Sequence, residues 1–233
     1  SENSRRAGAC SGPFSLVNLV DEAVWTHVEE VVASGDGDRY VATFFAPRER
    51  RRALLALYAF DHEVSHIGVT VREPLAGHIR LAWWREQIAA MYANGSLQAP
   101  VPEALAEVVR AHALPRAPFE RYLDARALDL QEAPFDDEAA MEAHALGVGG
   151  GIVHLAVQVL GAGERADIAA AHAGIAMAYA RHLNDAAAFA ARRRCRFPVS
   201  WLADAGVNAE DFFAVREGSA ALRPVFERMR AAV

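Results

Sequence analysis

The chain has 233 residues, 24 basic and 30 acidic side chains, a formal net charge of -6 and two cysteines. A chain of this length can bury a core without disulfides, the acidic balance argues against a nucleic-acid-binding protein, and two cysteines favour a reducing, cytoplasmic compartment. We expect no membrane-spanning segment, because no run approaches about 18 apolar residues. We expect no secretory signal, because the N-terminal residues are small and polar and lack an apolar core.

Apolar residues recur at helical rather than alternating spacing along almost every long stretch, and alanine and leucine dominate the composition. Proline or glycine marks most of the expected helix ends, as at Pro47, Pro74 and Asn94-Gly95. After a flexible N-terminus at 1–15, the pattern predicts helices at 16–33, 48–67, 74–93, 102–113, 116–131, 139–160 and 165–190, followed by three short helices that Pro198, Asn208 and Ser219 delimit. We therefore expect one all-α domain over residues 16–233.

The segment Gly147 to Gly151 lies inside an otherwise helical pattern. Each glycine costs about 1 kcal/mol relative to alanine in a helix interior, so its presence calls for a reason. One interpretation is a kink or a close helix contact beside a long apolar ligand. The other is a break between two ordinary helices, and the sequence leaves both open.

The segment His62-Glu63-Val64-Ser65-His66 has the H-E-x-x-H pattern that places two zinc-binding histidines on one face of a helix. Glu86 offers a third ligand on the next expected helix. A zinc peptidase is a remote alternative, because Val69 and Arg72 stand where the longer pattern needs Gly and His, and no edge strand is predicted. The simpler interpretation is a set of polar residues at a helix interface.

Two arginine clusters could bind anions. One is Arg192-Arg193-Arg194-Cys195-Arg196, and the other comprises Arg48, Arg50, Arg51 and Arg52 at the start of an expected helix, where anions are favoured. They could hold a diphosphate or an anionic lipid headgroup, or they could be solvated charges that form salt bridges at helix ends.

Several segments together carry a resemblance to a known family. They are Phe45-Ala46-Pro47, Arg50 to Phe60, Arg72-Glu73-Pro74, Ile79 to Glu86, Leu183-Asn184-Asp185, Arg194 to Pro198 and Ala205-Gly206-Val207. These segments resemble the squalene/phytoene synthase family over about residues 38–230. The resemblance implies the all-α isoprenoid synthase fold, a helical bundle with a large central cavity, and a family that usually runs on for further C-terminal helices.

Active members of the family join two prenyl diphosphates head to head and hold them through Mg²⁺ ions on two aspartate-rich motifs. Hard Mg²⁺ prefers carboxylate oxygens, and carboxylates four residues apart share one helix face. The resemblance places these motifs at 65–69 and 185–189, where this chain departs from the pattern and keeps one carboxylate; the positions concerned are Ser65, His66, Val69, Asp185 and Phe189. We therefore expect no catalytic set, no cofactor, and Mg²⁺ only if the chain is active.

Other residues near these positions remain candidates for binding. As ligand-binding residues we expect Arg48, Arg51, Arg52, Tyr58, Arg194 and Arg196. As metal ligands we expect Asp61, His62, His66, His182 and Asp185, a set whose imidazoles suit Zn²⁺ better than Mg²⁺.

A branch of this superfamily, represented by a mitochondrial assembly factor of respiratory complex I, has lost the aspartate motifs and kept the fold. The resemblance to that branch implies a non-catalytic scaffold with a respiratory-complex subunit or another assembly factor as partner. It also implies a cytoplasmic chain in peripheral contact with the inner membrane face, or a matrix protein in a eukaryote. The alternatives are a prenyltransferase with a degenerate site and a module that binds an isoprenoid or lipid without chemistry.

Overall fold

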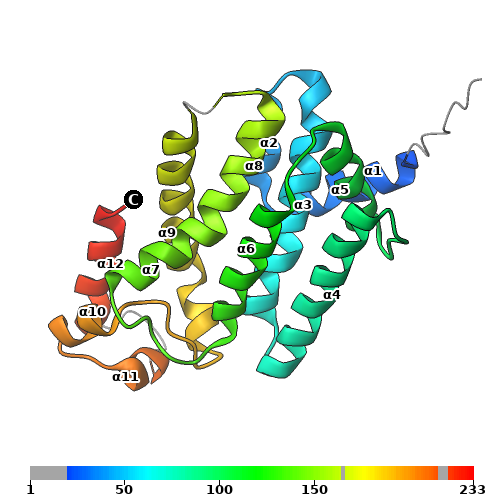
Figure 1. The fold of residues 1–233 in the computed structure, drawn as a ribbon. Helices are drawn as coiled ribbons and strands as arrows, with labels where there is room; N and C mark the ends of the chain where they lie inside the picture. Colours follow the sequence, from blue (N-terminus) through cyan, green and yellow to red (C-terminus); the bar gives the residue numbers. More distant parts are fainter. Residues whose placement is uncertain (1–19, 164–165, 215–219) are drawn as a thin grey trace, which may run out of the picture.

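The computed structural model describes residues 20–163, 166–214 and 220–233, and it is helical (Figure 1). The N-terminal segment expected to be flexible, 1–15, lies outside the described residues. The elements are α1 (Glu22–Gly35), α2 (Gly37–Thr43), α3 (Arg48–Thr70), α4 (Pro74–Ala93), α5 (Pro100–Ala111), α6 (Arg116–Ala127), η1 (Leu128–Leu130), α7 (Glu138–Ala145), η2 (Leu146–Gly150), α8 (Gly151–Leu160), α9 (Asp167–Ala190), α10 (Val199–Asp204), α11 (Ala209–Ala214), η4 (Ala220–Leu222) and α12 (Arg223–Ala231). Among these residues the single β feature is an isolated bridge between Phe135 and Pro198, which confirms the all-α prediction.

The helix boundaries agree with the punctuation of the sequence, with two exceptions. Pro47 directly precedes α3, and Pro74 occupies the first turn of α4, where its missing N–H is not needed. The first exception is α1, which begins at Glu22 after its cap Asp21 and not at residue 16 as predicted. The second is α2, which was not predicted, because Ser34 to Gly37 resembles only a helix end. Asp36 instead caps the new helix, since its side chain accepts a hydrogen bond from the Arg39 amide.

Helix α3 forms the centre of the bundle and packs against α1, α4, α5, α8 and α9. Its apolar side chains are buried on more than one face, as expected for a helix surrounded by others. Phe60 shows the packing: its ring meets Trp84 of α4 at 5.0 Å and Phe119 of α6 at 5.6 Å, both edge to face. Such contacts stabilise aromatic pairs beyond the effect of burial alone.

The glycine-rich segment is η2, one turn of π-helix between α7 and α8, so the chain stays helical from 138 to 160 without a break. Its glycines allow the backbone to approach α9 very closely. A Cβ atom added at Gly149 would lie 1.8 Å from the carbonyl oxygen of Gly174, and one at Gly174 would lie 2.3 Å from the Gly150 nitrogen. The close helix contact is therefore the correct interpretation of these glycines.

The continuous stretch Glu138–Leu160 is long and apolar enough, by length and composition alone, to cross a membrane. This differs from the expectation of no membrane-spanning segment, because glycine and polar residues interrupt the apolar runs of the stretch. In the structure it packs against α3, α6 and α9, and nearly half of it is buried. These contacts are those of a core helix.

Candidate functional site

A pocket lies between α3, α9 and the η2–α8 segment, where the family resemblance places a cavity. Its lining includes Asp61, Ser65, Ile152, His182 and Phe189. The inner part offers about 30 Å³ of free space, which is room for one or two water molecules but not for a prenyl chain. Toward the surface it meets a wider depression of about 610 Å³, lined by Asp36, His62, His66, Arg181 and Asp185 among others.

An ion-pair cluster around Asp61 closes the inner pocket. Asp61 is buried on α3. Its carboxylate oxygens form ion pairs with the guanidinium nitrogens of Arg126 of α6, at 3.2 Å, and of Arg181 of α9, at 2.9 Å. Arg39 of α2 donates to the same carboxylate, and so does the hydroxyl of Tyr122. Both carboxylate oxygens are therefore occupied by hydrogen-bond donors from three other helices.

Two more carboxylates, one on either side of Asp61, extend this ion-pair cluster and compensate the charge of its arginines. On the outer side Asp36 accepts from Arg39 at 2.6 Å and from Arg181 at 3.2 Å. On the inner side Asp129 lies 3.1 Å from Arg126. Three carboxylates thus face three guanidinium groups along a chain of contacts through the bundle, which is the arrangement that buried charges require.

The electrostatics of Asp61 follow from this arrangement. Burial alone would raise the pKa of Asp61, but Arg181, Arg39 and Arg126 together hold that pKa well below its usual range. The ionised carboxylate is saturated by guanidinium groups. This differs from the metal-ligand role expected for Asp61, because a cation would have to displace the arginines.

The H-E-x-x-H segment does not assemble into a three-ligand site. The rings of His62 and His66 lie with centroids 3.9 Å apart on the outer side of α3, and His66 is exposed. Glu86 is exposed on α4. Among the residues that the structure describes, no group of three metal-binding side chains includes His62, His66, Asp61 or Asp185. This arrangement does not support the zinc-peptidase alternative.

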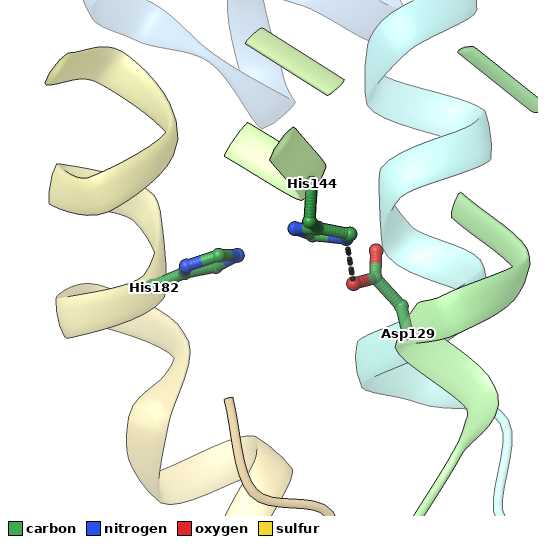
Figure 2. Close-up of side chains that lie close together, drawn as sticks. All are labelled: Asp129, His144 and His182. Atoms are coloured by element: carbon green, nitrogen blue, oxygen red, sulfur yellow. Dashed lines mark ion pairs between the residues drawn. The ribbon is translucent and has the colours of Figure 1, made fainter. Parts of the chain in front are cut away.

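One such group does exist in the described part of the chain, and it contains His182. Figure 2 shows His182 of α9 turned toward His144 of α7, which lies beside Asp129 of η1. The His144 Nε2 atom is 2.9 Å from the Asp129 carboxylate, and the two imidazole rings stack at 5.3 Å. Burial, followed by the proximity of His144, lowers the pKa of His182 well below its usual value, so this imidazole is neutral. The sequence analysis predicted His182 but missed its two neighbours, whose only signal is polar side chains in apolar surroundings.

The expected ligand-binding arginines divide into two kinds. Arg194 and Arg196 are buried, and their guanidinium groups donate to main-chain carbonyls: Arg194 to Gly68 and Val71, and Arg196 to Leu128, Gln131 and Ala133. They hold the end of α3 and the segment after α6, so they do not face an anion site as expected.

The other expected ligand-binding residues lie near the start of α3. Arg48 is exposed; Arg51 donates to the carbonyls of Phe44 and Ala46; and Arg52 pairs with Glu22 on the surface. Tyr58 is half-buried, and the guanidinium carbon of Arg39 lies over its ring, 4.8 Å from the ring centroid. These residues do not converge on the central pocket.

We expect Arg194→Ala to lower the free energy of unfolding by about 2 kcal/mol or more, because it leaves carbonyl groups at the buried end of α3 without donors. Urea unfolding followed by circular dichroism measures this. The matched control is Arg193→Ala, which removes an exposed ion pair with Glu210 and should leave the free energy of unfolding close to that of the wild type. Equal effects of the two substitutions would show that Arg194 does not brace the helix end.

Comparison with known proteins supplies the family. The family model of squalene/phytoene synthase matches residues 32–232. The chain belongs to the squalene/phytoene synthase family. It is 28% identical over 184 residues to NADH dehydrogenase (ubiquinone) complex I, assembly factor 6, of Mus musculus, covering 78% of this chain and 55% of that protein. It is 27% identical over 215 residues to 15-cis-phytoene synthase of Pantoea ananas, covering 87% of this chain and 68% of that enzyme.

The fold agrees with the family assignment. The crystal structure of squalene synthase HpnC from Alicyclobacillus acidocaldarius superimposes with a TM-score of 0.72 at 20% identity, covering 90% of this chain and 80% of that one. The isoprenoid synthase fold expected from the sequence is thereby confirmed.

The Mg²⁺–diphosphate site of the squalene/phytoene synthase family does not fit the residues of this chain. Ser65, His66 and Val69 on α3 offer no carboxylate, and the Ser65 hydroxyl is bonded to the His62 carbonyl and to Arg181. On α9, Phe189 is buried, and Asp185 is the single carboxylate among residues 185–189. Burial raises the pKa of Asp185, which weakens it further as a ligand for a hard cation.

Proposed function

We propose that this chain is a non-catalytic scaffold that supports the assembly of respiratory complex I. The observation that carries the proposal is the segment 65–69 of α3, which faces the pocket without any carboxylate. Ionisation of a prenyl diphosphate needs several Mg²⁺ ions held by opposed carboxylates, and Asp185 alone cannot supply them. The arginine cluster around Asp61 lines the inner pocket, which offers only about 30 Å³ of free space.

The similarity to the complex I assembly factors of mouse and rat supports the choice of complex I. The chain spans about 55–61% of the length of these relatives. The partner we propose is accordingly a complex I subunit or another assembly factor, bound by the helical bundle that the chain shares with them.

We also propose that the chain works in peripheral contact with the inner membrane, on the matrix side if its source is a eukaryote. The turn between α2 and α3 supports this, because Phe45 is 89% exposed beside Phe44 and the exposed Arg48. An aromatic tip with a flanking cation is suited to an anionic lipid surface.

Prenyl transfer, or binding of an isoprenoid without chemistry, is the second candidate. The similarity to 15-cis-phytoene synthase favours it, and Mg²⁺ would then be required. The 30 Å³ of inner space and the missing carboxylates weigh against it.

Deletion of the gene in the organism that encodes the chain tests the proposal. We expect loss of fully assembled complex I on native gels and of NADH oxidation by membranes, with normal levels of squalene and carotenoid precursors. Complementation with the wild type and with Asp185→Ala should restore complex I equally, because a scaffold does not need the remaining motif carboxylate. Normal complex I in the deletion strain would overturn the proposal.

An assay in vitro distinguishes prenyl transfer and isoprenoid binding from the proposed scaffold function. The protein is incubated with Mg²⁺ and radiolabelled farnesyl or geranylgeranyl diphosphate, and diphosphate release is scored. We expect no release above that of Asp185→Ala. Release above this control would establish an enzyme, whereas binding of the label without release would establish an isoprenoid-binding module.

A further inference from the structure

We propose that Asp129, His144 and His182 form a binding site for a divalent transition metal, with Zn²⁺ as the best-fitting ion. The three side chains come from η1, α7 and α9, and all three are buried. Each offers a ligand atom, and these atoms lie within 4.8 Å of one another. The site uses none of the positions 65–69 and 185–189, so it is separate from the family's Mg²⁺ motifs.

The bonding of these side chains indicates that something is held between them. The Asp129 Oδ1 atom and the His144 Nε2 atom lie 2.9 Å apart without an aligned hydrogen bond, and the other ring nitrogen of His144 and both of His182 are buried without a hydrogen-bond partner. Buried polar atoms are nearly always paired, and leaving them unpaired is costly. These three residues hold five of the eight buried side-chain atoms that lack an aligned partner in the part of the chain that the structure describes.

A metal ion satisfies these atoms better than another protein group could. An unprotonated ring nitrogen from each histidine and a carboxylate oxygen present one lone pair each, and a cation accepts them together. Ligand atoms about 2.0–2.1 Å from a tetrahedral Zn²⁺ lie roughly 3.3 Å apart, so small side-chain rotations bring this set to the required spacing. Two histidines and one carboxylate leave a fourth position for water.

The surroundings position Asp129 and select the type of metal. Arg126 binds the other oxygen of Asp129, Oδ2, at 3.1 Å, and leaves Oδ1 turned toward His144. The neighbouring guanidinium groups of Arg126 and Arg196 disfavour cations held mainly by charge, such as Mg²⁺ and Ca²⁺. The binding of an ion with strong affinity for imidazole is weakened least by these positive charges, because its bonds to nitrogen contribute more to its affinity. Because His182 and Arg126 line the inner pocket, a metal can reach the site from there.

A bound ion would join η1, α7 and α9, the three elements that carry these side chains (Figure 2). Any ligand that binds the folded chain alone stabilises it. The role assigned here is therefore structural, and it is independent of the scaffold function proposed above.

The test uses the full chain without a histidine tag, stripped with EDTA and then incubated with Zn²⁺ or Co²⁺. We expect about one zinc per chain after dialysis, a rise in Tm with Zn²⁺ that EDTA reverses, and a visible Co²⁺ spectrum typical of tetrahedral coordination. His182→Gln and His144→Gln should lower the bound zinc at least tenfold and remove the rise in Tm. His66→Ala, which changes an exposed histidine of the H-E-x-x-H segment, should leave both unchanged.

The Co²⁺ spectrum of the wild type keeps the test decisive if a glutamine variant does not fold. Less than one tenth of a zinc per chain with no Co²⁺ signal would overturn the proposal. Loss of zinc in His66→Ala but not in His182→Gln would also overturn it. Neither result would affect the complementation experiment that tests the proposed scaffold function.

Discussion

Replacement of Asp61 by asparagine is expected to lower the free energy of unfolding by about 3–5 kcal/mol. The substitution keeps the size of the side chain but removes the charge that compensates Arg39, Arg126 and Arg181. Arg39 and Arg126 are buried, so the one or two water molecules for which the pocket has room cannot supply the charge of the lost carboxylate. An uncompensated buried charge costs more than the ion pair itself contributes, which is why this single change should have a large effect.

Urea unfolding of Asp61→Asn and of Glu22→Gln measures this effect against a matched control. Glu22 also forms an ion pair with an arginine, Arg52, at 2.6 Å, but both side chains are more than half exposed. An exposed pair contributes less than about 1 kcal/mol, so Glu22→Gln should unfold close to the wild type. If the two variants have the same midpoint, the cluster does not hold the helices together.

Gly174→Ala is expected to destabilise the fold by about 3 kcal/mol, near the upper end of the usual cost of overpacking. The added methyl group would lie 2.3 Å from the Gly150 nitrogen and 2.4 Å from its Cα atom. Both are backbone atoms, so no rotamer change relieves the contact, and α9 must move away from η2. The shift would also widen the inner pocket, which both elements line.

Gly151→Ala serves as the control for this prediction. Gly151 follows η2 directly and has helical backbone angles, but an added Cβ meets no atom within 4 Å. Alanine is a better helix former by up to about 1 kcal/mol, so this variant should equal or exceed the wild type in stability. Thermal and urea unfolding of both variants measure the two effects. A Gly174→Ala variant as stable as Gly151→Ala would contradict the close backbone contact between α9 and η2.

The elements of this fold that the sequence predicts are those with a long apolar period and a clear boundary residue. Helices α3 and α4 combine buried leucine and aromatic residues with a proline at the start, so both signals agree. Helix α2 has only seven residues and begins at a glycine, so its sequence resembles a linker. It forms because Asp36 caps it and Arg39 reaches the Asp61 cluster, a contact between residues 22 positions apart that no local pattern shows.

The site was predictable where the family pattern fixes a position, and not where charges meet across helices. The loss of carboxylates at Ser65 and Val69 can be read directly from the sequence. The sequence also shows that Arg194 is basic, but whether it binds a diphosphate or the end of α3 depends on burial. The positions of Asp129 and His144 in the sequence do not predict that they lie near His182. The three residues belong to separate elements and come together only when these elements pack.

The arginine cluster also determines what an aspartate introduced at the family's metal-motif positions would contact. An aspartate restored at position 65 would arise where Arg181 now lies 3.2 Å from the Ser65 hydroxyl, and it would form an ion pair with that arginine instead of binding Mg²⁺. A second restored at position 69 would still face the outer depression without an opposing carboxylate at Phe189. Each of these substitutions taken singly would therefore leave the chain without two opposed carboxylate motifs, so we expect neither to create a Mg²⁺–diphosphate site.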